Sequence, residues 1–309
     1  SKNKKYKLIF PLVIRNFFGL KIIEIAGGKV SDYLSPIFHK KLKLFNEDLN
    51  FFKEKIFKNF KNADLIFFNK QKQYYSSPNP ILELDKPIIH LHKSYNIRFD
   101  SFVKHKKIKK ILNDNKRQIK RLKTMGDVIF FEANDHNKKL SIIKNMIFQK
   151  ESRYKKTNVW NMFEKSYYKD FYYDLIGSDF NFLKIHVSAM KVGDKFISTH
   201  FGFFNDTTYY YLMPSFDNIN FNSYSGGNIL LENLTNFAQT NNIGIFDFTI
   251  GNENYKKKWT NESNDLYNII LSNSVYGKLA KLTIKFIFFL KRIKLIDKIY
   301  KKIYKLLHK

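Results

Sequence analysis

The chain contains no cysteine in its 309 residues. This absence excludes disulfide bonds, metal sites built on thiolates and cysteine nucleophiles, so any catalytic mechanism must use other groups. It also points to a reducing compartment or to none in particular, because small secreted domains are usually held together by disulfides.

Arginine is scarce as well. Lysine and arginine together number 55 against 27 acidic residues, which gives a formal net charge of +28. Only six of these cations are arginine, at Arg15, Arg98, Arg117, Arg121, Arg153 and Arg292. Nucleic-acid readers rely on arginine for bidentate contacts to phosphate and guanine. The composition therefore argues against a dedicated nucleic-acid protein, whereas the charge alone also suits an anionic membrane.

Long apolar runs are missing too. No segment of about 20 uncharged apolar residues is present, so we expect no transmembrane span. Residues 2–18 have a basic start and an apolar stretch, but Arg15 interrupts it and no small-residue cleavage site follows. We therefore expect no signal peptide and a cytoplasmic protein.

The first half of the chain alternates strand and helix patterns. Strands are predicted at 8–14, 20–25, 65–68 and 127–132, a short edge strand at 87–92, and helices at 49–60, 138–150 and 162–175. Residues 104–123 predict an amphipathic helix with a wide basic face, which is either a solvated face or a binding surface. This alternation is typical of an α/β half-domain.

From residue 182 the pattern changes to antiparallel strands. Three β-rich runs, 182–192, 195–205 and 207–213, are joined by Gly193-Asp194 and by Asn205-Asp206, which are hairpin signals. We expect a later strand at 267–272 to close the same sheet.

Residues 226–259 read in order as a turn, a helix, a strand and a polar loop. Ser225, Gly226 and Gly227 precede an apolar helical pattern that begins near Asn228. Glycines allow an anion to approach the free N–H groups of a helix N-terminus, so this turn is a candidate anion site. The alternative is an ordinary turn before a helix.

The predicted strand at 243–248 is apolar except for Asp247. An acid there is either a strand-end cap of the next turn or a catalytic group. The loop that follows brings Glu253, Tyr255 and Lys256 close together, a mixture that can bind a polar substrate. His200 lies on a predicted strand. Its ring is either hydrogen-bonded to a neighbouring residue or available as a base.

This segment resembles the C-terminal acetyltransferase domain of the CelD/BcsL-type acyltransferases of cellulose and exopolysaccharide biosynthesis, members of the GNAT superfamily. The matching residues are Ser225, Gly227, Leu230, Gly244, Asp247, Phe248, Gly251, Glu253, Tyr255 and Lys256. Shorter matches lie upstream at Ser31-Asp32-Tyr33, in the basic stretch 104–126 and at Arg153-Tyr154. The family commonly has Ser-Pro-Gly before the helix, whereas this chain has Ser-Gly-Gly.

The resemblance implies an α+β fold of tandem GNAT-like (acyl-CoA N-acyltransferase) domains, with mixed, mostly antiparallel sheets flanked by helices. We expect an N-terminal half at 1–100, an acyltransferase domain at 101–277 and a basic amphipathic helix at 278–309. That helix could lie on an anionic membrane, pack on its own domain or form a coiled-coil seam. The first option predicts peripheral attachment to the inner face of a membrane.

The same resemblance implies transfer of an acyl group, without a metal, from acetyl-CoA or another acyl-CoA to an amino or hydroxyl group of a sugar or cell-envelope glycoconjugate. The cofactor-binding candidates are Ser225, Gly226, Gly227, Asn228 and Lys256. The catalytic candidates are Asp247, Glu253 and His200 as base and Tyr255 as acid or oxyanion donor. Asp32 and Arg153 are candidates for binding the acceptor. Two alternatives are a FemAB-like transfer from aminoacyl-tRNA and a membrane-bound scaffold without catalysis.

Overall fold

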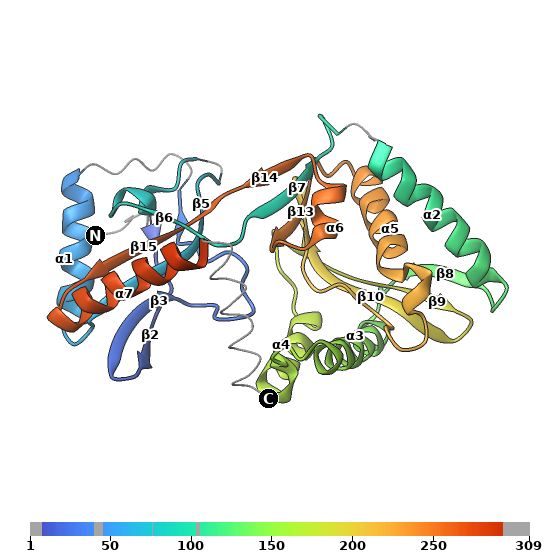
Figure 1. The fold of residues 1–309 in the computed structure, drawn as a ribbon, viewed down its shortest axis with the longest axis horizontal. Helices are drawn as coiled ribbons and strands as arrows, with labels where there is room; N and C mark the ends of the chain where they lie inside the picture. The colour runs from blue at the N-terminus through green and yellow to red at the C-terminus, as the bar shows by residue number, and fades with distance from the viewer. Residues whose placement is uncertain (1–7, 40–45, 76, 103–105, 293–309) are drawn as a thin grey trace. The chain divides into compact units, whose positions relative to one another are not determined.

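The computed structural model describes residues 8–39, 46–75, 77–102 and 106–292 (Figure 1). These residues form two compact units. The first comprises the described parts of segments 1–94, 250–252 and 264–309, and the second comprises 95–249 and 253–263. Each unit has a sheet with helices on its faces.

The sheet of the first unit has five strands in the order β2 (Leu12–Phe17), β3 (Leu20–Ile25), β5 (Leu65–Lys72), β15 (Leu266–Ser272) and β6 (Ile88–Ile89). β3 and β5 are parallel, and the other neighbours are antiparallel. A separate pair joins β1 (Leu8–Ile9) to β4 (Ile37–Phe38).

Two helices cover the two faces of this sheet because its strands are apolar on both sides. On one face Leu49 and Ile56 of α1 (Asn46–Asn59) join a core with Ile23 and Ile66. On the other face Ile284 of α7 (Val275–Arg292) packs against a cluster of Ile22, Leu65 and Ile270. The short helix η1 (Pro80–Glu83) adds Ile81 to the first of these cores.

The sheet of the second unit has eight strands. Seven follow the order β14 (Glu262–Asn264), β7 (Ser94–Arg98), β13 (Ile245–Ile250), β11 (Thr208–Tyr211), β10 (Lys195–Phe204), β9 (Lys184–Val192) and β8 (Val128–Glu132). The eighth, β12 (Ser215–Phe216), also pairs with β10. β8 to β11 are antiparallel, whereas β11 and β13 are parallel.

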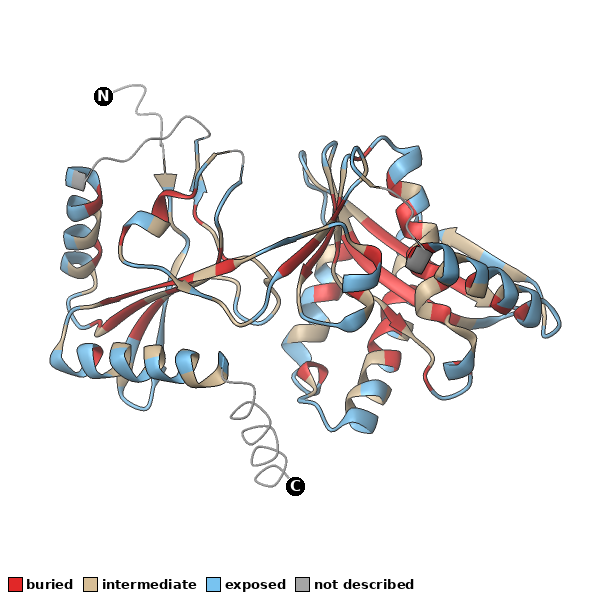
Figure 2. Ribbon diagram, turned by 45° about the horizontal axis from the view of Figure 1, so that its top comes forward, coloured by how far each residue is buried: buried red, intermediate tan, exposed pale blue. Residues whose placement is uncertain are grey.

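The helices of the second unit lie on both faces of that sheet. α5 (Gly226–Thr240) packs its Leu230 and Leu234 on Tyr209 and Phe246, and α2 (Lys106–Lys123) contacts α5. α3 (His136–Thr157) and α4 (Ser166–Ile176) lie on the other face, where the ring of Tyr172 meets that of Phe201. Shorter helices are η2 (Met162–Glu164), η3 (Asn222–Tyr224) and α6 (Asn254–Trp259). Figure 2 shows the buried residues concentrated on the strands and on the inner faces of the helices.

The predicted helices at 49–60 and 138–150 and the three hairpin strands from 182 to 213 are confirmed, with shifted ends. α5 begins at Gly226 rather than near Asn228, so both glycines lie in its first turn. The expectation that residues 267–272 close the second sheet was wrong, because β15 lies between β5 and β6. β15 has four consecutive buried residues, as a central strand of the first sheet requires.

The expected boundaries 1–100, 101–277 and 278–309 differ from the two units. Tyr95 and Ile97 of β7 belong to the core of the second unit, and β15 and α7 belong to the first. α7 begins at Val275 and is described to Arg292, so residues 293–309 of the predicted basic helix lie outside the described residues.

Candidate active site

The parallel strands β11 and β13 separate at one end. Their pairing runs from Thr208 and Ile245 to Tyr210 and Asp247. β13 then continues to Ile250, whereas the chain after Tyr211 turns away into β12, which pairs with β10. The strands therefore stop pairing next to the N-terminus of α5, which follows β12 in the chain.

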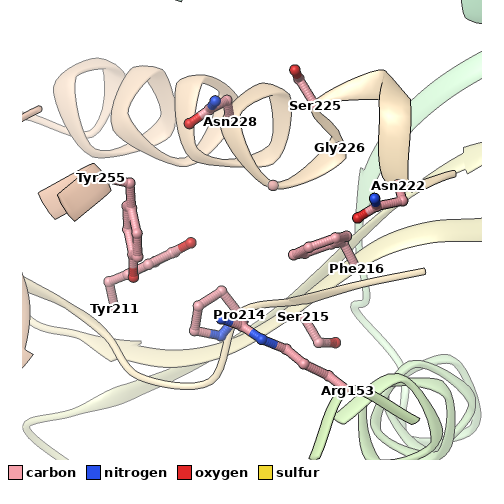
Figure 3. A pocket seen from close by; sticks show the side chains of 11 residues that line it. Arg153, Tyr211, Pro214, Ser215, Phe216, Asn222, Ser225, Gly226, Asn228 and Tyr255 are labelled. Atoms are coloured by element: carbon pink, nitrogen blue, oxygen red, sulfur yellow. The ribbon is translucent and has the colours of Figure 1, made fainter. Parts of the chain in front are cut away.

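A pocket of about 240 Å³ lies at this place in the second unit (Figure 3). Its walls come from the end of β11 and the segment that follows it, the first turn of α5, the helix α3 and the helix α6. The lining residues are Arg153, Tyr211, Pro214, Ser215, Phe216, Asn222, Ser225, Gly226, Gly227, Asn228 and Tyr255. The pocket thus combines aromatic rings, one guanidinium group and a helix N-terminus.

The first turn of α5 presents backbone rather than side chains. Ser225 has a left-handed backbone with φ of 54°, and its carbonyl accepts hydrogen bonds from the N–H groups of Asn228 and Ile229. The Ser225 hydroxyl does not cap the helix but donates to Oδ2 of Asp114, 3.2 Å away on α2. This leaves the first N–H groups of the helix to a ligand, and an anion is the ligand that suits them.

Packing alone does not require glycine in this turn. A Cβ atom on Gly226 would lie 3.5 Å from the carbonyl oxygen of Ile197, and one on Gly227 would lie 3.6 Å from Cδ1 of Phe216. Both are ordinary van der Waals distances. The two missing side chains therefore serve access to the backbone from the pocket.

Two phenols face the pocket. Burial raises the pKa of Tyr255, the Glu253 carboxylate raises it further, and Arg153 acts in the opposite direction. Burial also raises the pKa of Tyr211 well above its ordinary value, and Tyr255 adds to this effect. Both phenols are therefore protonated at neutral pH and can donate a hydrogen bond or a proton.

Arg153 supplies the positive charge of the pocket. Its guanidinium carbon lies 5.9 Å from the centre of the Phe216 ring, and Figure 3 shows the side chain reaching from α3 toward Pro214. Among the residues that the structure describes, no carboxylate lies within ion-pair distance of Arg153. The guanidinium is thus available to an anionic group of a ligand.

A family model described as an acetyltransferase (GNAT) domain matches residues 109–257. The protein contains a GNAT-type acetyltransferase domain. All the pocket residues fall within the matched range. The predicted superfamily is thereby confirmed for this domain. A search of curated protein sequences found no match.

Solved structures share the fold at low sequence identity. The C-terminal domain of a proposed lysylphosphatidylglycerol synthetase from Agrobacterium fabrum is 10% identical with a TM-score of 0.55, over 89% of this chain and 86% of that one. L-PGS from Bacillus licheniformis is 9% identical with a TM-score of 0.54, over 88% and 84%. FemX is 10% identical with a TM-score of 0.55, over 92% and 89%. The predicted α+β fold of tandem GNAT-like domains is confirmed.

The GNAT-type pocket brings together part of the predicted site. The first turn of α5, with Ser225, Gly226, Gly227 and Asn228, lines it, and so do Tyr255 and Arg153. The other predicted residues are not among the lining residues. They are Asp32, His200, Asp247, Glu253 and Lys256.

Asp247 is buried in the middle of β13, where its Oδ1 accepts a hydrogen bond of 2.7 Å from the N–H group of Thr249. Thr249 has a left-handed backbone with φ of 58°. An aspartate that accepts from the N–H group two residues on makes the bond of an Asx-type turn. Asp247 therefore supports the turn that leads to the loop of Glu253 and Tyr255.

Glu253 and Lys256 lie one turn apart at the start of α6 and form an ion pair of 3.2 Å. The Glu253 side chain is about half exposed, whereas that of Lys256 is buried. His200 is buried on β10, and its ring stacks on that of Tyr211. Asp32 belongs to the first unit, where it raises the pKa of Lys70 against the lowering effect of burial.

Five of the lining residues were not predicted from the sequence: Tyr211, Pro214, Ser215, Phe216 and Asn222. Pro214 was the available signal, since proline cannot donate to a sheet ladder and ends the run that contains Tyr211. Hydrogen bonds hold Ser215, the residue after Pro214. Its hydroxyl lies 2.6 Å from that of Thr199 and donates to the side-chain oxygen of Gln149 at 2.8 Å.

In the described ranges no group of three or more metal-ligating side chains could hold a metal ion.

Proposed function

We propose that the chain moves an acetyl or other acyl group from acyl-CoA to an amino or hydroxyl group of a sugar or cell-envelope polysaccharide intermediate. The observation that carries the proposal is the pocket at the glycine-opened N-terminus of α5, beside the point where β11 and β13 stop pairing. The pyrophosphate of the CoA would accept hydrogen bonds from the N–H groups of Gly226 and Gly227. The thioester would then lie toward Tyr211 and Tyr255.

In the proposed reaction the acceptor oxygen or nitrogen attacks the thioester carbonyl and gives up its proton to a base. The C–S bond breaks, and a phenol of the pocket protonates the leaving thiolate. Tyr255 and Tyr211 suit that role because both phenols stay protonated at neutral pH. Arg153 suits an anionic group of the acceptor.

Among the predicted candidates, Glu253 suits the role of base best. Its carboxylate is half exposed and interacts with Tyr255 of the pocket. Asp247 already accepts the hydrogen bond of the Thr249 turn. His200 is fully buried behind Tyr211. Lys256, paired with Glu253, then holds this carboxylate in place rather than anchoring a phosphate.

A second candidate function is aminoacyl transfer from aminoacyl-tRNA, as the FemAB-like alternative implies. The fold likeness to FemX and to a proposed lysylphosphatidylglycerol synthetase domain favours it. The basic helix α2, which packs on α5, would meet RNA phosphates in that case. A scaffold without catalysis is the third possibility.

We further propose that the protein is cytoplasmic and attaches peripherally to the inner face of a membrane. The basic helix predicted at 278–309, described here as α7 up to Arg292, supports this part. In the described ranges, none of the helices is suited to crossing a bilayer.

A thermal-shift titration tests the proposed donor. A ligand that binds only the native state stabilises it. The gain grows with the logarithm of the ratio of the ligand concentration to its dissociation constant, so the melting temperature rises as acetyl-CoA is added. We expect acetyl-CoA to stabilise the protein and a nucleoside without phosphates to have no effect. Stabilisation by aminoacyl-tRNA but not by acetyl-CoA would favour the second candidate, and no stabilisation by either would favour a scaffold.

A further inference from the structure

The hairpin of β2 and β3 in the first unit ends in an exposed phenylalanine. β2 ends at Phe17 and β3 begins at Leu20, so the loop consists of Phe18 and Gly19. Both have positive φ angles, 49° and 82°, as in a type I′ turn. Asn-Gly is the preferred sequence for this turn, and a bulky residue is strained in the left-handed region.

The fold does not explain Phe18. Its side chain is 92% exposed, so it contributes to no core, and asparagine would relieve the backbone strain. Phe17, Val13 and Ile14 on β2 are also exposed. Phe18 strains the turn and gains no burial in return, and it lies beside an apolar strand. This combination indicates that the hairpin contacts something apolar outside the chain.

The outer face of α7 has the same character. Seven of its large apolar side chains are exposed, most of them three or four residues apart. They are Val275, Tyr276, Leu279, Leu282, Phe286, Ile287 and Phe289. The helix has no acidic residue, and its cations are Lys278, Lys281, Lys285, Lys291 and Arg292. Figure 2 shows the outer positions of this helix as exposed.

The hairpin and α7 belong to one surface of the first unit. Ile284 on the inner side of α7 packs against Ile22, and Leu20 at the start of β3 packs on the same cluster. α7 therefore crosses the sheet face close to the hairpin turn. The two apolar elements are held by one core, independently of the second unit.

We infer that the hairpin tip and the outer face of α7 together insert into an anionic lipid bilayer. This inference rests on the proposed peripheral attachment and adds the hairpin as a second point of insertion. Aromatic and aliphatic side chains flanked by lysines suit the boundary between acyl chains and headgroups, where ammonium groups reach lipid phosphates. The acid-free helix and the net charge of +28 fit an anionic surface better than a second copy of the same cationic chain.

Co-sedimentation of the full chain with vesicles tests the inference. We expect it to pellet with phosphatidylcholine vesicles that contain phosphatidylglycerol and to pellet far less with phosphatidylcholine alone. Phe18→Asn and the pair Leu282→Gln and Phe286→Gln should each lower the bound fraction severalfold. The matched control is Phe182→Asn, because Phe182 is 87% exposed but lies in the second unit. This control should bind like the wild type.

The absence of cysteine allows a direct measurement of insertion. A single Phe18→Cys variant with a polarity-sensitive dye should show a blue shift on addition of anionic vesicles, and a Phe182→Cys variant should not. Phe18→Asn should melt at the wild-type temperature or above, because asparagine suits the turn, so lost binding cannot come from unfolding.

Three results would overturn the inference. They are full vesicle binding by both the hairpin and the helix variants, no binding by the wild type, or a dimer in solution that Phe18→Asn dissociates. Acetyl-CoA stabilisation is measured on the same proteins. If acetyl-CoA stabilises the protein but the protein does not bind vesicles, only the membrane inference is contradicted. If the protein binds vesicles but acetyl-CoA does not stabilise it, only the proposed acyl-CoA reaction is contradicted.

Discussion

The ring of His200 lies on that of Tyr211, with centroids 5.1 Å apart and planes within 10° of parallel. Nδ1 of His200 faces the Tyr209 hydroxyl at 3.3 Å, and this hydroxyl also meets Nδ1 of His186 at 2.5 Å. One wall of the pocket is therefore backed by buried imidazoles. Burial in this wall lowers the pKa of His200 and favours its uncharged form.

The first prediction concerns pH. Burial lowers the pKa of His200 well below its ordinary value of 6.5, and His186 adds to the effect. Below about pH 6.5 the unfolded state binds a proton that the folded state does not, so stability falls as pH falls. Denaturant unfolding between about pH 5 and 8 should show this loss, at up to about 1.4 kcal/mol per pH unit. His200→Gln should reduce it, and an equal slope in both proteins would contradict the assignment.

The second prediction concerns Tyr255. If its phenol protonates the leaving thiolate, Tyr255→Phe should lower kcat about 100-fold and leave acetyl-CoA stabilisation almost unchanged. Tyr224→Phe is the control, because Tyr224 is near the first turn of α5 but does not line the pocket. Unchanged turnover in Tyr255→Phe would remove Tyr255 from the reaction.

The third prediction compares two helical glycines. A Cβ atom on Gly277 of α7 would collide with the backbone carbonyl of Asp64. Gly277→Ala should therefore destabilise the protein by about 1–3 kcal/mol, although alanine normally favours a helix. Gly227→Ala, with ordinary contacts, should keep full stability and lose acetyl-CoA binding. Denaturant unfolding measures the stability of the two variants, and thermal shift measures their acetyl-CoA binding. A Gly277→Ala protein as stable as the wild type would contradict the close contact between α7 and Asp64.

The fourth prediction separates the two interpretations of Asp247. As a cap, Asp247→Asn keeps the acceptor for the Thr249 N–H group, so stability and turnover should stay close to those of the wild type. Asp247→Ala should cost about 1–3 kcal/mol because it leaves that buried group without its acceptor. A large fall in turnover of Asp247→Asn, with acetyl-CoA stabilisation retained, would instead identify Asp247 as the base.

Local patterns predicted the parts of the site that are continuous in sequence. The glycine-opened helix and the loop with Tyr255 follow from spacing and turn chemistry within about 30 residues, as helix-start and turn signals do. Tyr211 was not recognised, because it lies in an ordinary β-rich run. Tyr211 lines the pocket because it lies just past the last residue of β11 that pairs with β13. The pairing of these two distant strands therefore decides its position.

Pairing between distant segments was the part that the sequence could not predict. β15 has the apolar run of any buried strand, and it pairs with β5, almost 200 residues earlier in the chain. The side-chain pattern of a strand defines which residues are buried but not which strand is its neighbour. The first unit also contains α7, whose contacts with β15 and β5 likewise join segments that lie far apart in the chain.

Hydrogen exchange of the backbone tests the central claim most directly. With saturating acetyl-CoA, we expect slowed exchange in the peptide covering residues 222–231, because the N–H groups of Gly226 and Gly227 would be hydrogen-bonded to the pyrophosphate. Gly227→Ala should abolish this protection without changing exchange elsewhere. Unchanged exchange in this peptide, or protection confined to other parts of the chain, would contradict the account.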